Sequence, residues 1–64
     1  MQTNINYLKD SEIKSLKVGD RLSNKQIDGH IIECYPKEST GWGITYSFKV
    51  KNEHGRTQIV SKEI

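Results

Sequence analysis

The residue types that could do acid–base, nucleophilic or metal chemistry are few in this chain and poorly grouped. It has two histidines, His30 and His54, and one cysteine, Cys34. His30 and Glu33 are three positions apart, which would place them on one face of a helix, but in a strand they point to opposite sides. His54 lies in the polar stretch 52–55, which is typical of a turn. The sequence therefore predicts neither an acid–base pair nor a metal site.

The single cysteine and a pair of glycines each admit a chemical interpretation. Cys34 could act as a nucleophile, but a lone cysteine in a strand is more often a small residue in or near the core. Gly41 and Gly43 invite a phosphate-loop interpretation, yet the dinucleotide fingerprint needs a third glycine and a following helix. Here a segment with the period of a β-strand follows. We therefore expect no enzyme, no cofactor and no metal ion.

The remaining group of functional side chains is basic and aromatic. Four cations and two aromatic rings lie around a loop predicted over 36–43 and a hairpin predicted over 46–60. Basic side chains interleaved with aromatic ones can hold phosphates and stack bases. The candidate binding residues are Tyr35, Lys37, Trp42, Lys49, Lys51 and Arg56.

The same residues also have a purely structural interpretation. Lysines on a strand at the edge of a sheet protect it from aggregation, and Trp42 could fold over the core as a lid. However, glycines flank Trp42, and large apolar rings on loops are favoured anchors for recognition. The strand predicted over 44–50 already supplies an inward apolar face. We therefore predict that Trp42 is partly exposed on the 36–43 loop and serves recognition more than folding.

Length and composition restrict the function further. A chain of 64 residues buries only about 60% of its unfolded surface, which leaves little room for a small-molecule pocket. Ten Lys and Arg against eight Asp and Glu give a net charge of +2, a slight preference for anionic partners. One cysteine cannot form an internal disulfide. The first ten residues are polar and contain no apolar run that could act as a signal peptide. No segment has the ~20 apolar residues of a membrane span. We expect a cytoplasmic monomer with no membrane partner.

A short helix is predicted near the N-terminus. Ser11 can cap its free amides, and Glu12 suits the positive end of its dipole. Ile13 and Leu16 share one side, and Gly19 would end the helix. The segment 16–22 then places Leu16, Val18 and Leu22 on one alternating face that we expect to be buried.

Turns and a second strand follow. Residues 23–26 predict a turn, and Asp28–Gly29 a second, tight one. Residues 30–35 predict a strand that Pro36 ends. Because Ile31 and Ile32 are both apolar, this strand is expected to contact the core on both faces.

The clearest pattern is a hairpin near the C-terminus. Apolar residues alternate with polar ones from 44 to 51, the period of an antiparallel strand with one wet face. Residues 52–55 fit a turn with Gly55 in the left-handed conformation. In that register Phe48 faces Val60 and Val50 faces Gln58. Residues 61–64 are predicted to form one closing turn that brings Ile64 onto the core.

This order of elements resembles an SH3-like barrel, and four pieces carry the resemblance: 18–22, 29–31, 46–60 and 61–64. The resemblance implies a mainly β fold of about five antiparallel strands, with the barrel over 16–64 and an N-terminal extension with a short helix over 1–15. The chain lacks the long acidic first loop of the peptide-binding members. Its short first loop and Asp28–Gly29 are closer to the KOW and Tudor-like branches, whose members often contact nucleic acid, ribosomes or polymerase.

Two functions from different classes follow. The first is a non-catalytic binding module that contacts nucleic acid or a nucleoprotein through the basic and aromatic residues. The second is a small protein of phage or mobile-element type that binds a host protein as an adaptor or inhibitor. Self-assembly through an edge strand is a third hypothesis. Oligonucleotide titration, capture of a partner and light scattering would separate them.

Overall fold

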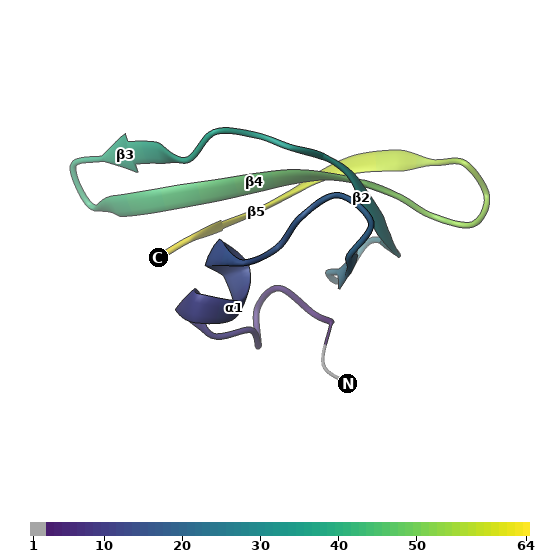
Figure 1. Ribbon diagram of the computed structural model, residues 1–64, viewed down its shortest axis with the longest axis horizontal. Coiled ribbons are helices and arrows are strands. Elements are labelled where there is room, and N and C mark those ends of the chain that lie inside the picture. Colours follow the sequence, from purple (N-terminus) through teal and green to yellow (C-terminus); the bar gives the residue numbers. More distant parts are fainter. Residues whose placement is uncertain (1–2) are drawn as a thin grey trace.

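The computed structural model describes residues 3–64, which form one five-stranded sheet and one short helix (Figure 1). All strand pairs are antiparallel. The mainly β fold with about five antiparallel strands and a short N-terminal helix is therefore confirmed. The elements are α1 (Asp10–Lys14), β1 (Arg21–Ser23), β2 (Asp28–Cys34), β3 (Glu38–Thr40), β4 (Gly43–Lys51) and β5 (Thr57–Glu63).

β4 is the central strand of the sheet. β5 pairs along one side of it, and β2 and β3 follow one another along the other side. β1 pairs with β2 at the far side. Within residues 3–64, β5 has no strand partner besides β4, so the sheet stays open and does not close into a barrel. The closing turn predicted over 61–64 is wrong, because β5 continues to Glu63.

The hairpin between β4 and β5 has the predicted register. Phe48 pairs with Val60, and Val50 pairs with Gln58. The Asn52 amide donates to the Arg56 carbonyl oxygen at 2.9 Å. Gly55 has a φ of 82°, the left-handed conformation that this turn needs and that glycine adopts at low cost.

The N-terminal segment belongs to the same core as the sheet. Asn4 forms a parallel bridge with Ser23 along the free side of β1, and the Ile5 amide donates to the Ser23 carbonyl oxygen at 2.9 Å. The boundary at residue 16 stays a sequence prediction, but three buried side chains precede it. The core consists of Ile5, Leu8, Ile13, Leu22, Ile27, Ile31, Phe48, Val50 and Val60, with Leu16, Tyr46 and Ile64 packed against it.

Two residues expected in the core are exposed. Val18 is 60% exposed because residues 17–20 form a turn in which Gly19 has a φ of 97°. Ile32 is 42% exposed because the register of β2 against β4 shifts between Ile31 and Glu33. An extra residue at such a bulge leaves the regular alternation of faces. The prediction that β2 contacts the core on both faces is therefore wrong.

The helix and the first turns also differ in detail from expectation. α1 begins after Lys9, whose amide donates to the Glu12 carboxylate at 3.0 Å, so Ser11 lies inside the helix and does not cap it. The helix ends at Lys14, well before Gly19. The turn predicted over 23–26 lies one residue later, over 24–27, because Ser23 still belongs to β1 and Asn24 Oδ1 accepts from the Gln26 and Ile27 amides. The tight turn predicted at Asp28–Gly29 is wrong, because both residues are in β2.

No helix in the described part of the chain is long and apolar enough to cross a bilayer.

Candidate functional site

The sheet has one covered face and one open face. α1 and the N-terminal segment lie on the same side of the sheet (Figure 1), where Phe48, Val50 and Val60 are buried. Because side chains alternate along a strand, Lys49 and Lys51 lie on the opposite side, which we call the outer face. The strand partners of Lys49 there are Glu33 and Ile59.

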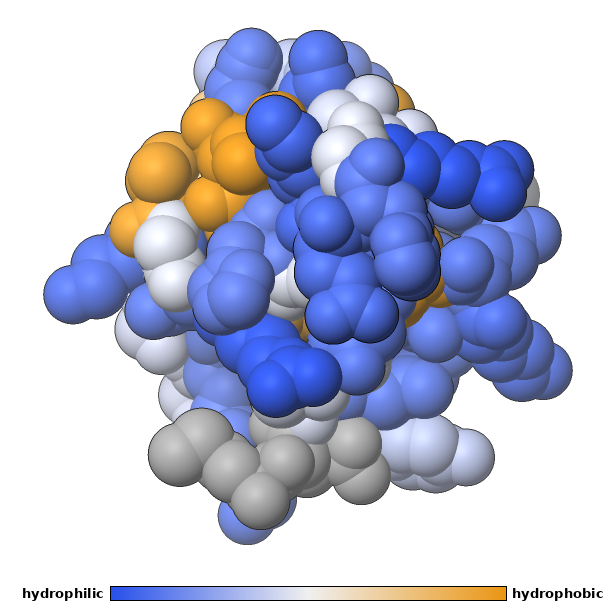
Figure 2. Space-filling model, turned by 90° about the vertical axis from the view of Figure 1, so that its right-hand side faces the viewer, coloured by the Kyte–Doolittle hydropathy of each residue, from blue (hydrophilic) through white to orange (hydrophobic). Residues whose placement is uncertain are grey.

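Lys49 lies between the acidic Glu33 of β2 and the apolar Ile59 of β5 on the outer face. Ile59, directly opposite in β5, is 49% exposed, and Ile32, at the bulge in β2, is 42% exposed. Lys49 itself is half-buried. A lysine stem can cover apolar surface while its ammonium group stays in water. In the view onto the β4–β5 turn, the surface is mostly hydrophilic, and the largest visible group of hydrophobic residues lies at the upper left (Figure 2).

Tyr35 extends this group. Its amide donates to the Ser47 carbonyl oxygen at 3.1 Å, so the residue continues along β4 directly after β2. Cys34 pairs with Phe48, and alternation then places Tyr35 on the outer face. The ring is 36% exposed. The structure therefore brings Tyr35, Lys49 and Lys51 together on one open face.

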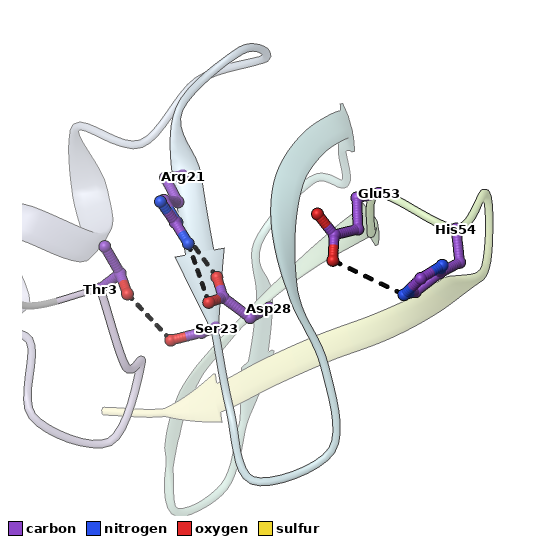
Figure 3. Close-up of polar contacts among 6 residues, drawn as sticks. All are labelled: Thr3, Arg21, Ser23, Asp28, Glu53 and His54. Carbon is purple, nitrogen blue, oxygen red and sulfur yellow. Dashed lines mark hydrogen bonds and ion pairs between the residues drawn. The ribbon is translucent and has the colours of Figure 1, made fainter.

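None of the four candidate cations, Lys37, Lys49, Lys51 and Arg56, forms an ion pair within residues 3–64. The cation that does pair with aspartate is Arg21, whose guanidinium lies 2.9 Å from the Asp28 carboxylate (Figure 3). This hydrogen bond holds the pKa of Asp28 below its usual value and raises the pKa of Arg21. Both groups are exposed, so the pair adds little stability. The four candidate cations remain available to an anionic partner.

Trp42 lies at the tip of the turn between β3 and β4 and is 92% exposed. The predicted loop over 36–43 is only partly a loop, because β3 pairs with the start of β4. Thr40 Oγ1 accepts from the Trp42 amide at 3.3 Å and from the Gly43 amide at 3.1 Å, which fixes the turn. The predicted exposure of Trp42 is confirmed and the lid interpretation is wrong. Its recognition role stays a prediction.

We expect Trp42→Ala to change the free energy of unfolding by about 1 kcal/mol or less, because the ring buries almost no surface. Denaturant melts of the variant and the parent protein measure this difference. The native fluorescence of the parent protein, whose single tryptophan is Trp42, should resemble that of a tryptophan in water. Blue-shifted emission, or a loss of stability similar to that of a core substitution, would contradict the exposed position.

The six candidate residues do not form one compact site. β4 has nine residues, which corresponds to about 26 Å at 3.3 Å per residue. Trp42 precedes one end of this strand, and Arg56 lies at the turn beyond the other end (Figure 1). Lys37 lies in the link between β2 and β3. The outer face with Tyr35 and the two β4 lysines is thus the centre of an elongated surface.

Sequence reasoning missed Ile32 and Ile59 as part of this surface. The predicted hairpin register already placed Ile59 opposite Lys49, so its exposure could have been found. The exposure of Ile32 depends on the bulge, for which the local sequence gives no signal.

One hollow of about 300 Å³ lies away from this face, between α1 and β1. Its two carboxylates already accept backbone hydrogen bonds: Glu12 from the Lys9 amide and Asp20 from the Lys17 amide. Its volume is at the low end for a ligand pocket. The described residues contain no group of three or more His, Cys, Asp or Glu arranged for a metal ion.

Comparison with known proteins found no protein family, curated protein or solved structure that matches this chain.

Proposed function

We propose that this protein is a non-catalytic, cytoplasmic binding module that contacts nucleic acid, free or within a nucleoprotein, through the outer face. The observation that supports this most is the placement of Tyr35, Lys49 and Lys51 on one open face, with no ion pair at either lysine in the described part of the chain. The covered face holds the core, so the outer face is free to meet a partner.

The chemistry of this face suits a single strand better than a duplex. Lys49 and Lys51 are two residues apart on β4, a spacing of about 6.6 Å, so both can contact one backbone. Tyr35 offers a ring on which an unpaired base can stack, and stacking of this kind tolerates any sequence. A net charge of only +2 favours a weak, salt-sensitive interaction.

The double variant Lys49→Gln/Lys51→Gln should bind a single-stranded oligonucleotide more weakly. Each lysine that neutralises a phosphate releases about 0.7 counterion from a single strand, so losing two should reduce the slope of log K against log salt by about 1.4. Fluorescence anisotropy at several salt concentrations measures both quantities. Tyr35→Leu should cost about 1–3 kcal/mol of binding through lost stacking.

The matched control is Lys14→Gln/Lys25→Gln, which removes the same charge from α1 and from the turn before β2, away from β4. It should leave the slope nearly unchanged. An equal loss in both double variants would mean that net charge alone attracts the oligonucleotide. The proposal fails if the parent protein binds neither DNA nor RNA at low salt.

A protein partner is the second candidate, and Trp42 favours it. A tryptophan that is 92% exposed on a turn held by hydrogen bonds is a typical anchor of a protein interface. The partner could be a host protein bound by a phage-type or mobile-element-type adaptor or inhibitor. Capture of one stoichiometric protein that resists nuclease and is lost with Trp42→Ala would support this function over the first.

A further inference from the structure

The unpaired side of β5 presents a regular row of backbone groups. At the end of its ladder with β4, the Ile44 amide donates to the Ile64 carbonyl oxygen at 3.2 Å, and the Ile64 amide donates back to Ile44 at 2.8 Å. Antiparallel ladders alternate between pairs that exchange such bonds and pairs that do not. Even-numbered residues of β5 therefore bond to β4. The residues that direct their amide and carbonyl groups away from β4 are Thr57, Ile59, Ser61 and Glu63.

This edge has little of the usual protection against strand pairing. Proteins guard edge strands with proline, bulges, or charged side chains that point outward or inward. The charged residues of β5 are Lys62 and Glu63. β5 contains no proline, and its register with β4 is continuous from Thr57 to Glu63. Lys62 points to the covered side, where its ammonium donates to the carbonyl oxygens of Ile5 and Asn6 at 3.3 and 3.2 Å, so pairing at the open edge does not leave this charge without partners. All four residues that face the open edge have exposed side chains.

We propose that β5 pairs with β5 of a second copy of this chain, antiparallel and centred on Val60. In this register Ile59 of one copy lies opposite Ser61 of the other, and Thr57 lies opposite Glu63. These are the residues whose backbone groups face the edge, so each of the four pairs exchanges two hydrogen bonds, about eight in all. A shift by two residues in either direction would lose one pair. The centred register satisfies every free group of the edge.

The side chains are compatible with this register. Glu63 faces Thr57 and Lys62 faces Gln58, so no like charges are directly opposite, an arrangement that would be destabilising. The two Ile59 side chains become diagonal neighbours, about 7–8 Å apart. This covers apolar surface that is 49% exposed in the single chain. The absence of opposed like charges and the meeting of the two Ile59 side chains favour a second copy as the occupant. The outer faces of the two copies then lie on one side of a continuous sheet.

The first test is the mass in solution. Sedimentation over a wide range of protein concentration should show a species of twice the 7.4 kDa of one chain. Ser61→Pro removes an amide that faces the open edge without removing a bond to β4, and it should weaken association about tenfold or more. Ser61→Thr retains the amide and should associate like the parent protein. A monomer at all concentrations, or a dimer unaffected by Ser61→Pro, would overturn the proposal.

The second test fixes the register and does not depend on the proline variant. In a Cys34→Ser background, which removes the free exposed thiol, one sample carries Ile59→Cys and another Ser61→Cys. Opposite residues of this kind lie about 5.5 Å apart between Cα atoms, within disulfide range. Under mild oxidation the mixed sample should form disulfide dimers faster than either variant alone. Equal rates in all three samples would refute this register.

Discussion

Gly29→Ala is expected to lower the free energy of unfolding by about 3 kcal/mol, at the upper end of the cost of overpacking. A Cβ at this position would lie 2.1 Å from the Lys51 carbonyl oxygen and 2.9 Å from Asn52 Cα. These are backbone atoms at the end of β4, so relief requires β2 to move away from that strand. Total stability at 0.05–0.15 kcal/mol per residue is about 3–10 kcal/mol for a chain of this length. The substitution should therefore unfold a measurable fraction of the protein.

Gly41→Ala is the matched control for this substitution. No atom lies within 4 Å of a Cβ built at Gly41, and its φ is not positive. The change should be neutral, or stabilising by a few tenths of a kcal/mol through the unfolded chain, as is typical where the new residue fits. Urea titrations of both variants, followed by circular dichroism, measure the difference. Equal midpoints for the two variants would show that β2 does not approach β4 so closely at Gly29.

Phe48→Ala is expected to cost about 3–5 kcal/mol, the range for removing a large aromatic side chain from a core. Phe48 is only 4% exposed and lies on the central strand, paired with Val60 on one side and Cys34 on the other. A cavity at this point removes contacts from the covered face of the sheet. For a small domain such a loss is close to the whole stability. We expect the variant to be largely unfolded at room temperature.

Trp42→Ala provides the comparison, since it removes an even larger ring from the adjacent turn. The two variants should differ by about 2–5 kcal/mol in the free energy of unfolding. Circular dichroism in one buffer should show little folded signal for Phe48→Ala before denaturant is added, whereas Trp42→Ala should unfold at nearly the denaturant midpoint of the parent protein. If the Trp42 variant unfolds as readily as the Phe48 variant, the tip of the β3–β4 turn packs on the core and cannot serve as a binding anchor.

The free edge of β5 results from the open sheet. A closed barrel would pair β5 on both sides and leave no free row of amides. In this chain the N-terminal segment lies along β1 instead, through the bridge between Asn4 and Ser23. Nucleic-acid binding and pairing of two copies use different groups, side chains on the face and backbone at the edge. Each proposal can therefore fail without the other.

The sequence by itself determined the β4–β5 hairpin. Strict alternation around Phe48 and Val50 assigned the faces, and a turn sequence with Gly55 assigned the register. Both are local properties, because strand faces follow from a period of two and a left-handed turn position from the residue that occupies it. The same pattern predicted that Lys49 and Lys51 lie on the polar face of β4. It also predicted that Trp42, which precedes the strand, is exposed.

Only the tertiary structure decided how the remaining parts meet. Ile5 and Leu8 are buried because the N-terminal segment crosses the sheet, a contact between residues far apart in the sequence. Ile32 is exposed because the bulge changes its face, and Gly29 is needed because β2 approaches the backbone of β4. Local periodicity contains no information on which distant segment covers a face. The grouping of Tyr35 with the β4 lysines, and the distance of Trp42 from them, depend on pairing between strands and so could not be read from spacing along the chain.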